Sequence, residues 1–148
     1  MKMRFPASAA AVLILSSAPA FADGPAWPAT EGAEVYFIGL EDGATVSSPV
    51  TVRMGLRGMG VAPAGTEREG TGHHHLLIDR APMGEGEADE FMFGLANDDH
   101  HRHFGGGQTE VTLDLPAGTH TLQLVFGDMG HVPFGPQMVS PVISITVE

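Results

Sequence analysis

The chain has 148 residues, with 18 acidic residues against seven lysines and arginines, and it contains no cysteine. This length supports one domain, and the lack of cysteine excludes a disulfide framework, a thiol nucleophile, cysteine-ligated zinc and iron–sulfur clusters. The formal net charge of −11 excludes nucleic acid as a partner, because a polyanion is bound through clustered lysines and arginines.

Residues 1–22 have the pattern of a cleaved signal peptide. Two basic residues stand near the start, residues 9–15 form an apolar run, and Ala20-Phe21-Ala22 matches the small-residue pattern of a signal peptidase site. The apolar run is too short to anchor the chain in a bilayer, and no cysteine follows it that could carry a lipid. We therefore predict cleavage after Ala22, a periplasmic or secreted mature protein, and no membrane anchor.

The remaining chain has the pattern of short β-strands separated by turns. Residues 23–33 are rich in proline, glycine and alanine, which predicts a flexible leader before a single domain over residues 34–148. Strands are predicted, in chain order, over residues 35–40, 50–56, 73–79, 111–115, 119–126 and 142–147. Residues 84–100 carry glycines at their ends and no clear helical period, so they are expected to form a loop.

These strands predict an all-β fold, because about seven short strands with regular turn signals are typical of two packed sheets. The favoured arrangement is a single antiparallel β-sandwich of immunoglobulin-like type. A cupredoxin-like or jelly-roll variant would give the same pattern, since the order of the strands in the sheets is not visible in a sequence.

The candidate chemistry lies in eight histidines, all in the second half of the chain. Side chains at i and i+2 of a strand share a face, so His73 pairs with His75, and His101 pairs with His103 if residues 99–104 are extended. Two such pairs on neighbouring strands, with His131 as a fifth ligand from a loop, predict a metal site. Imidazole without thiolate suits copper, zinc or nickel, and copper is favoured over zinc.

Carboxylates near these motifs are expected to orient the rings from outside the site. The candidates in the sequence are Asp79, Asp98, Asp99 and Glu110. His74 and His120 are expected to face the core instead, because each alternates in register with apolar residues.

The competing interpretation is a structural or interaction module whose histidines form a buried polar network. An enzyme is not predicted, because the motifs of serine hydrolases, zinc proteases and β-lactamases are absent from the sequence. The expected partners are therefore a metal ion and, secondarily, another periplasmic protein.

Five motifs resemble, in order, those of the DUF4399 domain family of secreted bacterial proteins. They are DGATVSSPVTV (42–52), GMGVAPAG (58–65), GTGHHHLLID (70–79), HRHFGGGQTE (101–110) and GTHTLQLVFGD (118–128). The resemblance implies a periplasmic or secreted β domain with the same His-x-His pairs, and it implies no activity. Where the family typically has N-H-x-P-H-x-P-P, residues 130–137 read GHVPFGPQ, so Phe134 replaces a histidine and a site that used this ligand would be weaker here.

Overall fold

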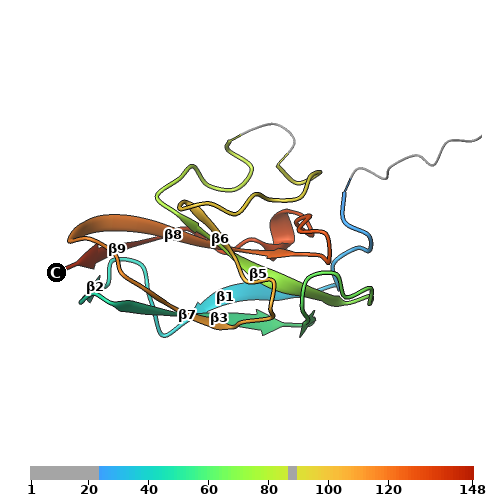
Figure 1. Ribbon diagram of the computed structural model, residues 1–148, viewed down its shortest axis with the longest axis horizontal. Coiled ribbons are helices and arrows are strands. Elements are labelled where there is room, and N and C mark those ends of the chain that lie inside the picture. Colours follow the sequence, from blue (N-terminus) through green and yellow to red (C-terminus); the bar gives the residue numbers. More distant parts are fainter. Residues whose placement is uncertain (1–23, 87–89) are drawn as a thin grey trace, which may run out of the picture.

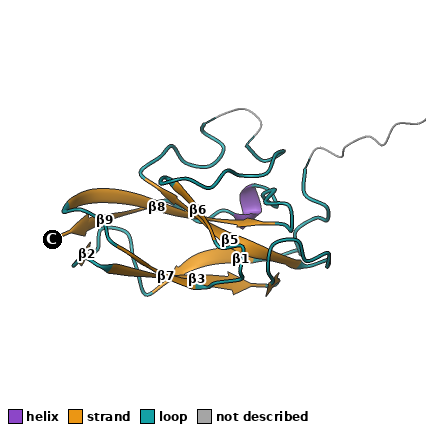
Figure 2. Ribbon diagram, viewed as in Figure 1, coloured by secondary structure: helices purple, strands orange, loops and turns teal. Residues whose placement is uncertain are grey.

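The computed structural model describes residues 24–86 and 90–148, which form two β-sheets and one short 3-10 helix, η1 (Pro136–Met138) (Figures 1 and 2). The predicted signal peptide lies outside the described residues. One sheet has three antiparallel strands in the order β1 (Glu34–Ile38), β3 (Val50–Arg57) and β7 (Glu110–Leu113). The other has six strands, five of them in the order β2 (Thr45–Val46), β9 (Ile143–Val147), β8 (Gly118–Gly127), β5 (Thr71–Ile78) and β4 (Gly60–Val61). The sixth, β6 (His101–His103), pairs with β5.

The predicted all-β class is confirmed, and each predicted strand overlaps a strand of the structure. The conditional strand around residue 101 is β6 (His101–His103). Two features were not predicted, the two-residue strands β2 and β4 and the helix η1, because such short elements carry no periodic pattern. The immunoglobulin-like type stays a prediction.

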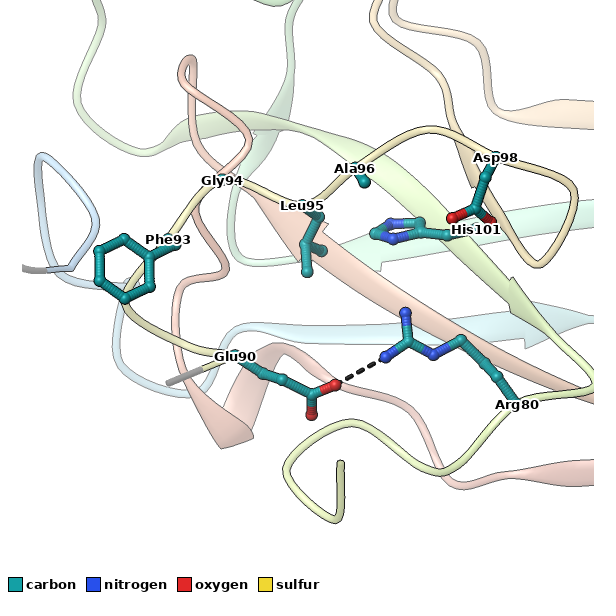
Figure 3. A pocket seen from close by; sticks show the side chains of 8 residues that line it. All are labelled: Arg80, Glu90, Phe93, Gly94, Leu95, Ala96, Asp98 and His101. Carbon is teal, nitrogen blue, oxygen red and sulfur yellow. Dashed lines mark hydrogen bonds and ion pairs between the residues drawn. The ribbon is translucent and has the colours of Figure 1, made fainter. Parts of the chain in front are cut away.

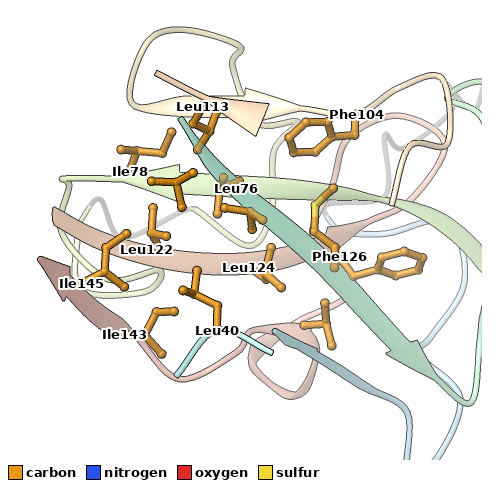
Figure 4. Packing of buried hydrophobic residues seen from close by; sticks show 14 of the residues in the cluster. Leu40, Leu76, Ile78, Phe104, Leu113, Leu122, Leu124, Phe126, Ile143 and Ile145 are labelled. Atoms are coloured by element: carbon orange, nitrogen blue, oxygen red, sulfur yellow. The ribbon is translucent and has the colours of Figure 1, made fainter. Parts of the chain in front are cut away.

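The main core lies between the two sheets (Figure 4). In β3 the alternation is as expected, since Val50, Val52 and Met54 are buried while the residues between them are exposed. They pack in one cluster with side chains such as Leu76 of β5 and Leu124 of β8. Full burial of each such side chain contributes about 1.5–3 kcal/mol to folding, so this cluster fixes the backbone positions of β5 and β8.

The outer face of the six-stranded sheet is also covered. Two connecting segments, residues 79–86 with 90–100 and residues 128–142, contact this face (Figure 1) and complete a second apolar cluster around Leu77 and Val125. The buried Gln123 of β8 holds both segments, because its side chain accepts a hydrogen bond from the backbone of residue 83 and donates one to the backbone of residue 140. Outer-face side chains in the middle of β5 and β8, such as Leu77 and Val125, are therefore enclosed.

The segment before β1 contacts the domain as well. The backbone N–H of Ala26 donates a hydrogen bond of 2.9 Å to Asp128, and Ala33 belongs to the main core. In the part of the chain that the structure describes, no helix is long and apolar enough to cross a membrane.

Candidate metal centre

Strand β5 carries three consecutive histidines and divides them between its two faces. His74 points into the main core, where its ring lies 5.2 Å from the ring of Phe126 in an edge-on arrangement. His73 and His75 point to the outer face, as the alternation of a strand requires. All three side chains are completely buried, so the rings of His73 and His75 are shielded from solvent on the outer face.

Strand β6 brings the second His-x-His pair alongside β5. The antiparallel register places His103 opposite His75 and His101 opposite Leu77. The ring of His103 lies 5.7 Å from the rings of both His73 and His75. The ring of His101 contacts His75 on its other flank, where Nε2 of His101 is 3.1 Å from Nδ1 of His75.

The fifth predicted ligand, His131, comes from the loop after β8. This loop is wound around Asp128, whose buried carboxylate accepts hydrogen bonds from the N–H groups of Gly130 and Val132 at 2.8 and 3.0 Å. His131 has a positive φ of 69°, a conformation that is uncommon for residues other than glycine and that is held only where the surroundings impose it. The loop thus directs the His131 ring onto β5.

Three of the five predicted ligands converge. One ring nitrogen from each of His73, His75 and His131 lies within 4.8 Å of the other two. Nε2 of His73 and Nδ1 of His131 are 2.9 Å apart. Nδ1 of His73 and Nε2 of His75 are buried without a hydrogen-bond partner within the described residues. His103 borders this triad, with its ring 4.5 Å from that of His131, whereas His101 does not join it.

Two glycines leave the space that the rings occupy. A Cβ atom at Gly127, which lies opposite His73 in the sheet, would be only 3.0 Å from Nε2 of His75. A Cβ atom at Gly105 would be 2.4 Å from Nε2 of His103. Glycine is therefore required at both positions, because any larger residue would push a histidine ring away from the cluster.

Burial keeps the imidazoles of the cluster neutral. It lowers the pKa of His73 from 6.5 to about 4, with neighbouring histidines adding to the effect. The pKa of His75 falls to about 2, mainly through burial and then through His73. The pKa of His131 is also lowered, first by burial and then by His103. At neutral pH these rings therefore present lone pairs, which is the form that binds metal ions.

The other histidines have separate roles. His74 makes no hydrogen bond through either ring nitrogen within the described chain, and burial lowers its pKa to about 4. His120 bonds to the carboxylate of Asp79 at 2.7 Å and to the backbone oxygen of Pro116 at 2.8 Å. His100 is exposed and contacts the backbone oxygen of Ile78. The expectation that His74 and His120 are structural is consistent with these contacts.

Three of the four carboxylates that were expected to orient the rings bond elsewhere, and no bond of the Asp99 side chain is present within the described residues. Asp79 holds His120, Glu110 pairs with Arg53, and Asp98 accepts the backbone N–H of His100. Sequence reasoning instead missed Asp128, which organises the loop of His131. The available signal was the local pattern of an aspartate two residues before a glycine, which favours a turn closed by the aspartate side chain.

Phe134, at the position where the resemblance suggested a lost ligand, belongs to the main core. Its ring stacks on that of Phe126 with centroids 5.9 Å apart. The backbone N–H of Phe134 also bonds to the backbone oxygen of Phe126. The four rings of His73, His75, His103 and His131 contact one another without it.

The comparisons with known proteins give one match. The model of a family described as "Domain of unknown function (DUF4399)" matches residues 52–148, which include every histidine discussed above. No curated protein and no solved structure matches the chain.

Proposed function

Because this chain belongs to the DUF4399 family, whose description names no activity, we propose a function from the site itself: the protein binds one transition-metal ion. The ligands are His73, His75 and His131, and copper is favoured over zinc. The protein binds the ion without catalysing a reaction.

One observation carries this proposal. Two buried imidazoles, His73 and His75, and the half-buried imidazole of His131 place ring nitrogens within 4.8 Å of one another, and Nε2 of His75 has no partner in the described chain. Burying a polar nitrogen without a partner is costly, and grouping such nitrogens at one point adds to this cost. A cation that accepts several lone pairs offsets this penalty for the whole group at once, whereas a water molecule can donate to at most two nitrogens.

The spacing of the nitrogens favours copper. With metal–nitrogen bonds of about 2.0–2.1 Å, two nitrogens 2.9 Å apart, as in His73 and His131, subtend about 90° at the metal, whereas a tetrahedral angle needs about 3.3 Å. Right-angled nitrogen ligands are typical of Cu(II) or Ni(II), and zinc prefers tetrahedral sites. Copper(II) is also bound more tightly than the other divalent ions of its row by a given site.

The ring of the third ligand, His75, must move slightly toward the other two for all three nitrogens to bind one ion. The triad allows separations up to 4.8 Å, while two nitrogens on opposite sides of one metal ion are about 4.1 Å apart. Closing this difference takes less than about 1 Å of ring movement, which small rotations of the side chains provide. His103, half-buried and adjacent to His131, is the fourth ligand in this proposal.

The setting of the site agrees with capture of a cation outside the cytoplasm. The N-terminal segment has the pattern of an exported protein, and the excess of 18 acidic over seven basic residues attracts cations. A periplasmic protein that delivers or receives the ion is the expected partner. Fractionation of cells expressing the chain, with detection of the processed form, tests the location.

Metal stoichiometry and affinity test the proposal. The untagged protein is stripped with a chelator, exposed to Cu(II), Zn(II) and Ni(II), and the bound ions are counted by native mass spectrometry. We expect about one equivalent of copper that survives a weak competitor. This binding should be lost in His73→Ala and His131→Ala and kept in His100→Ala, whose ring is exposed. Substoichiometric copper that any competitor removes would contradict a dedicated site.

A structural polar network is the second candidate, and the ring-to-ring hydrogen bonds His73–His131 and His75–His101 favour it. It makes a different prediction for the metal-free protein. If the bonds are structural, His73→Ala and His131→Ala should both lower the free energy of unfolding whether or not metal is present. If the site is for metal, the two variants should lose copper affinity well before they lose apo-protein stability.

A further inference from the structure

His101 differs from the other predicted ligands in where its ring nitrogens lie. Its Nε2 is 3.1 Å from Nδ1 of His75. The opposite nitrogen of His75, Nε2, lies toward Gly127 and the backbone of His131 and has no partner within the described residues. The His75 ring therefore has His101 at its Nδ1 side and the other two members of the triad, His73 and His131, at the opposite side.

The far side of His101 opens on a cavity. This cavity has a volume of about 360 Å³, and its walls include Arg80, Leu95, Asp98 and His101 (Figure 3). The side chain of Arg80 crosses it to pair with Glu90 at 2.6 Å. His101 is itself almost completely buried, and its side chain forms part of the cavity wall.

The hydrogen bond between the two rings can be made in two ways, because a neutral imidazole has one N–H and one lone pair. If His75 donates from Nδ1, its Nε2 keeps a lone pair toward the other members of the triad, and His101 carries its proton on Nδ1, which is not among the enclosed nitrogens without a partner. If His101 donates from Nε2, the proton of His75 must sit on Nε2, which is buried and has no acceptor within the described residues. Orphaned buried N–H donors are rarer than under-satisfied acceptors, so the first arrangement is favoured.

We propose that His101 is a positioning residue rather than a ligand: its Nε2 accepts a hydrogen bond from Nδ1 of His75 and holds the ring of His75 with the Nε2 lone pair toward the metal. This inference rests on the proposed function. It also replaces the symmetrical set expected from the sequence, in which both members of each His-x-His pair are ligands. Partners of this kind set the tautomer and orientation of a ligating histidine, and their loss typically weakens metal binding by about 10–100-fold.

Two substitutions separate positioning from ligation. In His101→Gln the side-chain carbonyl oxygen can still accept from Nδ1 of His75, whereas in His101→Leu no acceptor remains. Cu(II) alone is the probe, its dissociation constant is measured by competition with a weak chelator, and pulsed electron paramagnetic resonance counts the coordinated imidazoles. His100→Leu, at the neighbouring exposed ring, is the matched control.

We expect His101→Leu to weaken Cu(II) binding about 10–100-fold with the number of coordinated imidazoles unchanged. His101→Gln should bind within about threefold of the wild type, since the hydrogen bond is retained. Loss of one coordinated imidazole in both variants would identify His101 as a ligand and overturn the proposal. Unchanged affinity in His101→Leu would overturn it as well.

A measurement on the metal-free protein keeps this inference separate from the proposed function. Nitrogen-15 NMR of the histidine rings reports which nitrogen carries the proton. We expect Nδ1–H on His75 and Nδ1–H on His101 in the wild type, and Nδ1–H on His75 in His101→Gln. Finding the proton on Nε2 of His75 in the wild type would refute the positioning role, even if His101→Leu fails to fold and whatever the outcome of the metal titration.

Discussion

Replacing His74 by leucine should stabilise the protein, and the gain should grow as the pH falls. His74 is completely buried against Phe126, and neither of its ring nitrogens has a partner in the described chain. At pH 7.5 an unpaired buried polar group costs about 1–3 kcal/mol, and an apolar side chain of similar size removes this cost. His74→Leu should therefore raise the free energy of unfolding by that amount in neutral, metal-free conditions.

The pH dependence follows from the lowered pKa. Burial, followed by the nearby His73, lowers the pKa of His74 from 6.5 to about 4. Between these two values the unfolded chain binds a proton that the folded protein does not, so the wild type loses stability as the pH falls below 6.5. One such group costs 1.36 kcal/mol per pH unit, hence about 2 kcal/mol at pH 5.0. The advantage of His74→Leu should accordingly rise to about 3–5 kcal/mol.

Urea denaturation at pH 7.5 and pH 5.0, with a chelator present, measures both quantities. His73 and His75 also have lowered pKa values, but they are present in both proteins, so their contribution largely cancels in the difference. His100→Leu, at an exposed ring, should change stability by less than about 0.5 kcal/mol. If the difference in the free energy of unfolding between wild type and His74→Leu is the same at pH 7.5 and pH 5.0, the assignment of a buried neutral His74 is wrong.

Other substitutions test the surroundings of the site. His120→Ala should lower the free energy of unfolding by about 1–2 kcal/mol at pH 6 and by less at pH 9, as measured by urea denaturation. The reason is that hydrogen bonds to a carboxylate and a carbonyl raise the pKa of His120, and the stabilisation is lost as the pH rises through that value. Gly105→Ala should displace the ring of His103 and weaken copper binding, as measured by competition with a chelator. Gly106→Ala is the control, because the nearest atoms to its Cβ belong to the side chain of residue 108, and it should leave copper binding unchanged. Equal effects of the two substitutions would contradict the steric argument. Asp128→Ala should destabilise the fold by about 2–4 kcal/mol in urea, since three N–H groups lose their acceptor, and a smaller loss would mean that water replaces the carboxylate.

Local pattern was sufficient for the longer strands and for the faces of their side chains, but not for the two-residue strands β2 and β4. The alternation in residues 50–56 predicted the buried face of β3, and the same rule separated His74 from His73 and His75. The reason is that the period of two is a property of the extended backbone itself. Pairing of strands was not accessible in this way. Residues 116–118 were expected to form a turn into the next strand, and the structure shows that this turn leads from one sheet to the other.

The composition of the site was likewise visible in the sequence, and its geometry was not. Spacing indicated which histidines share a face, but only the register between β5 and β6 decides that His103 lies opposite His75 and that His101 contacts the far flank of the His75 ring. Only the fold of the loop around Asp128 decides that His131 reaches His73. Both outcomes depend on contacts between residues more than 20 positions apart in the chain. Such contacts arise from the packing of whole strands and loops, which local periodicity does not encode.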